Sequence, residues 1–142
     1  MFQTKSIFFT ALFAAATLFA CKKSDDLSSP GGGPAPAAGQ WKVTYFFDKK
    51  DETSNYGAYV FEFGSDGSMS AGNGSQSWSG SWSSGFDDSA NKFLINFSGT
   101  VPSALAELEE DWRIITMNDT FMHFEHTSGG NGDTDILKFT KL

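Results

Sequence analysis

The chain has 142 residues, with 10 lysines and arginines against 17 aspartates and glutamates and a formal net charge of −7 at pH 7. This acidic balance argues against a nucleic-acid partner, because nucleic-acid phosphates are bound by basic surfaces. The chain has one cysteine, which excludes an intrachain disulfide.

Residues 1–20 have the layout of a signal peptide. Lys5 is their only charged residue, and residues 7–20 form an apolar run that only two threonines interrupt. This run is shorter than the roughly 18 to 20 residues that a helix needs to cross the hydrocarbon core. A permanent transmembrane span is therefore the weaker interpretation.

The signal peptide ends at Leu18, Phe19, Ala20 and Cys21. These four residues resemble the lipobox of bacterial lipoproteins, which implies that the Cys21 thiol takes a diacylglyceryl group before cleavage. The alternative is an ordinary secretory signal that leaves an unpaired thiol in an oxidising compartment. The resemblance predicts a lipid anchor in the membrane of the cell envelope. We expect this to be the outer membrane, at its periplasmic face or at the cell surface.

Residues 21–38 have the composition of a flexible tether. They contain many prolines, glycines and serines and a single large apolar side chain, Leu27, so they cannot bury enough surface to fold. Residues 22–26 also resemble the short charged signals that send some bacteroidete lipoproteins to the cell surface. Cleavage before Cys21 removes Lys5 and no acid, leaving 9 basic against 17 acidic residues, a formal charge of −8. This charge argues against the folded domain lying on anionic lipid.

Residues 39–142 are predicted to form one all-β domain, because short runs repeat an alternation of apolar and polar residues. The first run covers residues 41–47. The side chains expected to face inward are Trp41, Val43, Tyr45, Phe47, Tyr59, Phe61, Phe63, Met69, Trp78, Trp82, Phe93, Ile95, Phe97, Trp112, Ile114, Met122, Phe124, Leu137 and Phe139. About eight strands are expected.

Short turns connect these runs. Glycine, asparagine and aspartate cluster at residues 65–67, 72–74, 118–119 and 129–133. Antiparallel strands joined in this way form a meander, and eight of them can close into a barrel that has no open edges. Residues 102–110 are the one helix candidate, of one or two turns, between strands five and six.

The order of short motifs resembles the lipocalin-like domains of bacteroidete lipoproteins. Gly39 and Trp41 match the Gly-x-Trp start of lipocalins, and Gly80-Ser81-Trp82 and the motif at residues 111–114 follow in order. The resemblance implies an up-and-down antiparallel barrel of the calycin type and a binding role. It implies a site for a small apolar or amphipathic ligand at the barrel mouth. The candidate lining residues are Trp41, Tyr45, Trp78, Trp82 and Trp112.

No catalytic, metal or cofactor site is predicted. His123, Glu125 and His126 are close in sequence, but alternation on a strand directs His126 away from the other two side chains. No nucleophile elbow or phosphate-binding glycine loop is present in the sequence. We therefore expect no enzyme activity.

Two classes of function remain open. In the first, the barrel binds a small apolar molecule at its mouth. In the second, it is a non-catalytic scaffold whose loops contact another envelope protein or a glycan. Thirteen of the nineteen inward side chains are aromatic, which predicts a largely filled interior with at most a shallow pocket at one end, covered by residues 101–110.

Overall fold

The structure is a computed structural model that describes residues 30–130 and 132–142. The predicted signal peptide and the lipidation site at Cys21 lie outside the described residues. The strands are β1 (Gln40–Asp48), β2 (Lys50–Asp51), β3 (Val60–Phe63), β4 (Ser68–Gly72), β5 (Ser77–Asp87), β6 (Ala90–Phe97), β7 (Asp111–Met117), β8 (Phe121–Thr127) and β9 (Thr134–Lys141). The helices are the 3-10 helix η1 (Thr53–Tyr56) and α1 (Ser103–Ala106). Among the described residues, no helix has the length and apolar character needed to cross a membrane.

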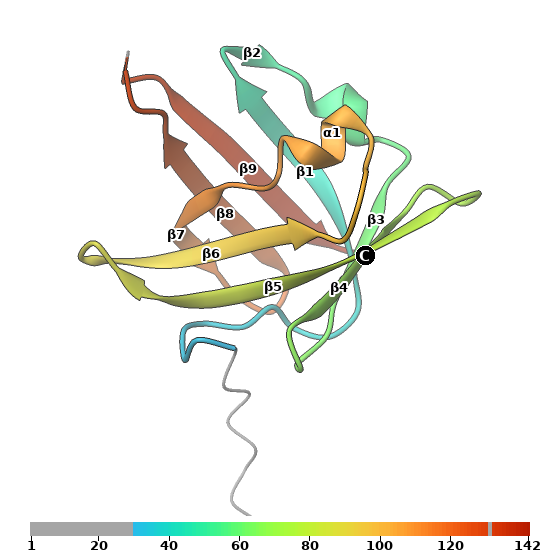
Figure 1. Cartoon of the computed structure of the whole chain (residues 1–142), viewed down its shortest axis with the longest axis horizontal. Helices are drawn as coiled ribbons and strands as arrows, with labels where there is room; N and C mark the ends of the chain where they lie inside the picture. Colours follow the sequence, from blue (N-terminus) through green and yellow to red (C-terminus); the bar gives the residue numbers. More distant parts are fainter. Residues whose placement is uncertain (1–29, 131) are drawn as a thin grey trace, which may run out of the picture.

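The strands form a closed antiparallel barrel (Figure 1). β1, β3, β4, β5, β6, β7, β8 and β9 pair in chain order, and β9 also pairs with β1 to close the ring. The two-residue β2 pairs only with the end of β1. The predicted all-β, up-and-down barrel of about eight strands is therefore confirmed. The short helix α1 lies between the fifth and sixth strands of the ring, as predicted.

The inward and outward alternation changes phase within β1. Trp41 and Val43 face the core, but the pairing of β1 with β9 shifts register between Val43 and Tyr45. A β-bulge adds one residue, so the following side chains exchange faces. Phe46 is therefore buried, whereas Tyr45 and Phe47 are half-buried and stack on each other with ring centroids 6.5 Å apart. The prediction that Tyr45 and Phe47 face inward is wrong for this reason.

Aromatic rings fill the centre of the barrel. The Phe93 ring stacks on Trp82 at 5.5 Å and on Phe124 at 4.8 Å, and its interplanar angles with them are 19° and 10°. Phe63 meets Phe93 edge-on at 5.8 Å. Offset and edge-to-face pairs are the favourable ring arrangements, so these contacts add to the stabilisation from burial alone.

One end of the barrel is covered by η1 and α1, and we call it the α1 end. Tyr56 of η1 is fully buried, and its hydroxyl donates a 2.8 Å hydrogen bond to the Ala104 carbonyl of α1. Leu105 and Leu108 are also fully buried in the core. The segment that was predicted to cover one end does so.

The other end is crossed by residues 30–39, which we call the strap. Ser84 of β5 donates its backbone N–H to the Pro30 carbonyl at 3.0 Å, and its own carbonyl accepts the Gly33 N–H at 3.0 Å. Pro36 is buried, and Ala35 packs against the core. Residues 30–38, which were predicted as part of the tether, therefore belong to the folded unit, because Pro30 and Gly33 bond to β5 and Pro36 is buried.

Candidate functional site

The five aromatic residues predicted to line a ligand site do not share one accessible surface. Trp41, Trp82 and Trp112 are at most 2% exposed and belong to the core. Trp78 is half-buried at the start of β5, with its ring 5.8 Å from Tyr59. Tyr45 lies on the outer face beneath the Lys138 ammonium group, which is 5.2 Å from its ring centroid.

Each buried tryptophan holds a segment that closes the barrel. The indole N–H of Trp41 donates to the Ala37 carbonyl of the strap at 3.0 Å. The indole N–H of Trp82 donates to the Gly64 carbonyl in the β3–β4 turn at 2.7 Å. The indole N–H of Trp112 donates at 2.9 Å to the Leu108 carbonyl, between α1 and β7. A buried indole N–H needs an acceptor, and here the acceptors are backbone carbonyls of the closing segments.

Three hollows lie at the surface of the described residues. One of about 470 Å³ lies between the strap and the β3–β4 hairpin, and a second of about 380 Å³ lies over the outer face of β3 and β4. Glu62 and Ser70 line both. A third, of about 190 Å³, lies over β5 and β6 beside Lys92, Leu94 and Asp111. All three are surface depressions whose lining includes outward-facing side chains.

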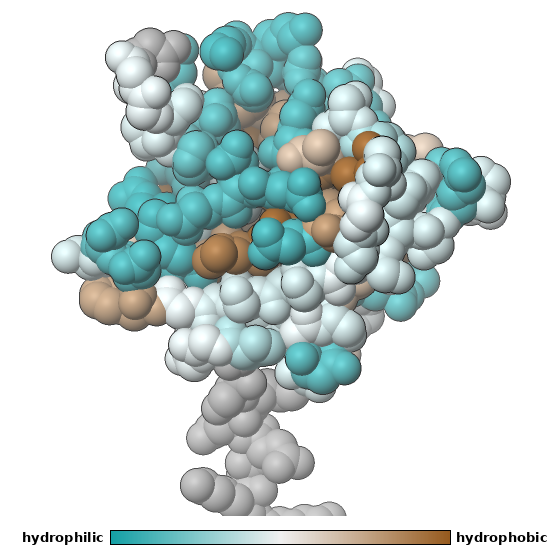
Figure 2. Space-filling model, in the orientation of Figure 1, coloured by the Kyte–Doolittle hydropathy of each residue, from teal (hydrophilic) through white to brown (hydrophobic). Residues whose placement is uncertain are grey.

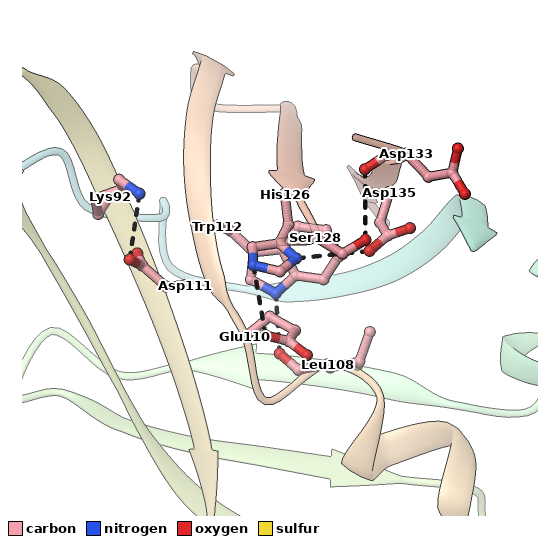
Figure 3. A network of polar contacts seen from close by, with 9 residues as sticks. All are labelled: Lys92, Leu108, Glu110, Asp111, Trp112, His126, Ser128, Asp133 and Asp135. Atoms are coloured by element: carbon pink, nitrogen blue, oxygen red, sulfur yellow. Dashed lines mark hydrogen bonds and ion pairs between the residues drawn. The ribbon is translucent and has the colours of Figure 1, made fainter. Parts of the chain in front are cut away.

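A polar network lies at the α1 end, where β8 ends and β9 begins (Figure 3). His126 Nδ1 is 3.5 Å from Asp135 Oδ2, and His126 Nε2 is 3.7 Å from Glu110 Oε2. The imidazole edge meets the Trp112 ring at 6.1 Å. His126 therefore joins three parts of the chain: the segment before β7, strand β8 and strand β9.

Both ring nitrogens of His126 face carboxylate oxygens of other segments. His126 Nδ1 and Asp135 Oδ1 are buried without a hydrogen-bond partner in the described part of the chain. The adjacent hydroxyl of Ser128 donates to the Asp133 carbonyl at 3.4 Å. The network therefore ties the start of β7 to the end of β8 and the start of β9.

His123 and Glu125 lie on the opposite face of β8, as the alternation predicted. His123 Nε2 is 3.6 Å from Glu125 Oε1, while Glu125 Oε2 accepts a 2.8 Å hydrogen bond from Arg113. Burial, followed by the nearby charge of Lys138, lowers the pKa of His123 below its ordinary value. Within residues 30–130 and 132–142, no group of three or more acidic, histidine or cysteine side chains is placed to hold a metal ion.

Acidic groups surround the buried hydroxyl at the α1 end. Glu107 Oε2 accepts a 3.4 Å hydrogen bond from the Tyr56 hydroxyl. Burial and the charge of Glu107 raise the pKa of Tyr56 far above its ordinary value. Burial, followed by the charge of Glu52, raises the pKa of Glu107. Lys50 pairs with Glu52 at 2.9 Å.

Large apolar side chains also reach the surface. Phe86 is 74% exposed and Leu142 is 67% exposed, whereas Leu94 and Ile115 are near 40%. Figure 2 shows a hydrophobic area beside the β5–β6 turn. The side chains predicted to face inward did not include Phe86, although the alternation of β5 continues as far as Asp87 and was the available signal.

The fold resembles one solved structure. A DUF4847 family protein from Bacteroides vulgatus ATCC 8482 superposes with a TM-score of 0.51 at 15% identity, covering 73% of this chain and 92% of that one. At this identity the likeness concerns the fold alone. No protein-family model and no curated protein sequence matches the chain.

Proposed function

We propose that this protein is a non-catalytic envelope lipoprotein whose filled barrel is a scaffold for contacts with another envelope protein or a glycan. The observation that carries the proposal is that three tryptophans fill the core and bind the closing segments, and so do not line an open site. Trp41, Trp82 and Trp112 are buried, and their N–H groups are bonded to the segments that close the barrel. A carrier of small apolar molecules needs an open, concave site, and here aromatic rings occupy that space.

The lipid anchor is the second part of the proposal. It is supported by the lipobox-like residues 18–21 and by the lone cysteine, Cys21. A diacylglyceryl group together with a further acyl chain would give stable anchoring, since each buried methylene contributes about 0.8 kcal/mol. The strap attaches the barrel directly to the segment that follows this cysteine.

Uptake of an apolar fluorescent probe tests the filled barrel. We expect N-phenyl-1-naphthylamine to show no saturable binding to the wild-type protein. A Trp82→Ala variant, in which a core cavity replaces the indole, serves as the positive control, because apolar cavities in proteins bind small apolar molecules. Saturable uptake by the wild-type protein would favour the carrier function instead.

Detergent-phase partitioning tests the anchor separately. The wild-type protein from a membrane fraction should enter the detergent phase, and Cys21→Ser should remain in the aqueous phase. The substitution removes the only thiol, so retention of the variant in detergent would contradict the lipoprotein proposal.

A further inference from the structure

The barrel wall is incomplete at the strap end, between β6 and β7. The ladder that joins them has three residue pairs, which match residues 92–94 with residues 111–113. The ladder between β7 and β8 continues to Met117, opposite Met122. In the described ladders, residues 114–117 of β7 therefore pair on one side only, while the β5–β6 hairpin turns away (Figure 1). Such an edge is a template for another strand.

Apolar side chains remain uncovered at the same end. Phe86 follows Trp82 and Ser84 in the inward alternation of β5, yet it is 74% exposed. Ile114 and Met117 pack against the core but are only half-buried, and Ile115 between them is 40% exposed. These exposures coincide with the stretch where β6 and β7 no longer pair. The split therefore combines an open backbone ladder with apolar surface.

The charges beside the split are negative. Asp87 and Asp88 follow Phe86, and Asp119 follows β7. No ion pair in the described part of the chain includes these three aspartates. The basic side chains of β6 and β7 are already paired: Lys92 lies 3.2 Å from Asp111, and Arg113 lies 2.8 Å from Glu125. A second copy would bring the same acidic edge, so charge complementarity favours a basic segment from a different protein.

We propose that the split between β6 and β7 is a strand-addition site for one extended segment of another protein, in which apolar residues alternate with lysine or arginine. This deepens the proposed scaffold function and rests on it. The backbone of the segment would pair with residues 114–117, which supplies affinity. Its apolar side chains would cover Phe86 and Met117, and its cations would face Asp87 and Asp119.

An extended peptide tests the site. The probe is an acetylated and amidated octapeptide that alternates valine and lysine, added to the ¹⁵N-labelled mature protein purified in detergent. We expect saturable shifts and slowed hydrogen exchange of the backbone amides in residues 114–117. The matched peptide with glutamate in place of lysine should bind at least about tenfold more weakly, and added salt should reduce this difference.

Two surface variants locate the contact. Phe86→Ser should weaken binding of the valine–lysine peptide about tenfold, because it removes the most exposed apolar side chain at the split. Leu94→Ser removes an exposed apolar side chain from the outer face of β6 and should change binding less than about twofold. Unchanged hydrogen exchange in both variants would show that they stay folded.

Three results would overturn the proposal: no binding at about 1 mM peptide, equal binding of the two peptides, or protection confined to another face of the barrel. None of these results bears on whether the barrel interior is filled. Failure of the proposed scaffold function would appear separately, as saturable probe uptake by the wild-type protein.

Discussion

The Tyr56 hydroxyl donates a 2.8 Å hydrogen bond to the carbonyl oxygen of Ala104, which joins η1 to α1 across one end of the barrel. The Tyr56 ring is fully buried and lies 4.9 Å from the Phe46 ring. One polar contact thus connects two segments that are separated in the chain by four strands, β3 to β6. Its loss can be separated from loss of packing, because phenylalanine keeps the ring.

Tyr56→Phe should lower the free energy of unfolding by about 1 to 2 kcal/mol, since it leaves the Ala104 acceptor without this donor. Urea unfolding followed by tryptophan fluorescence measures the change. Tyr45→Phe is the matched control, because Tyr45 is half-buried on the outer face, and we expect a change within about 0.5 kcal/mol. Equal effects of the two substitutions would contradict the role given to the Tyr56 hydroxyl.

Trp41 should behave as a core residue of the barrel. Trp41→Ala removes a fully buried indole and should cost about 3 to 5 kcal/mol. Trp41→Phe keeps an aromatic ring but removes the N–H that bonds Ala37, so it should cost less and mainly loosen the strap. Urea unfolding gives the stabilities, and limited proteolysis within residues 30–39 reports the strap. If Trp41→Ala left the free energy of unfolding nearly unchanged, the indole would line an accessible cavity.

The fold could be predicted largely from local patterns. Alternation placed Phe61, Phe63, Phe93 and Phe124 in the core, and each is at most 4% exposed. The change of phase at Tyr45 could not be predicted in the same way. A β-bulge depends on how β1 and β9 match in register, and these strands are distant in sequence.

The roles of the candidate site residues were harder to predict. Alternation correctly identified Trp82 and Trp112 as inward-facing, but it cannot identify the backbone carbonyl that accepts each indole N–H. These acceptors lie in or beside segments that the sequence predicts as a linker, a turn and a short helix. The strap shows the same limit, because its glycines are typical of a flexible tether although Gly33 pairs with Ser84.

Ionisation of Glu107 should weaken the protein slightly at neutral pH. Burial and the charge of Glu52 raise the pKa of Glu107 in the folded state. The loss of stability from ionising Glu107 is therefore absent below the ordinary glutamate pKa of about 4.3. It develops as the pH rises through the raised pKa of Glu107 in the folded state. Because Glu107 is exposed, we expect Glu107→Gln to stabilise the protein by about 0.5 kcal/mol or less at pH 7 and not at pH 3.5.

Glu52 provides the control for this pH effect. In a Glu52→Gln background, the stabilisation from Glu107→Gln at pH 7 should shrink, because one cause of the raised pKa is gone. Urea unfolding of the four proteins at both pH values measures the coupling. A gain from Glu107→Gln that is equal at both pH values would exclude ionisation as its cause.

Substitutions at two adjacent glycines test whether the strap is fixed on β5 or behaves as a flexible linker. Gly31 and Gly32 have φ values of 98° and 78°, so alanine is strained at both positions. A Cβ atom at Gly31 would collide with the Ser84 carbonyl oxygen, whereas a Cβ at Gly32 meets nothing within 4 Å. Gly31→Ala should therefore release the strap from β5 and increase proteolysis within residues 30–39 at least about tenfold more than Gly32→Ala. Gly31→Ala should also lower the free energy of unfolding by about 1 to 3 kcal/mol more than Gly32→Ala does. Equal proteolysis and stability of the two variants would mean that these residues behave as a flexible linker and do not hold the barrel closed.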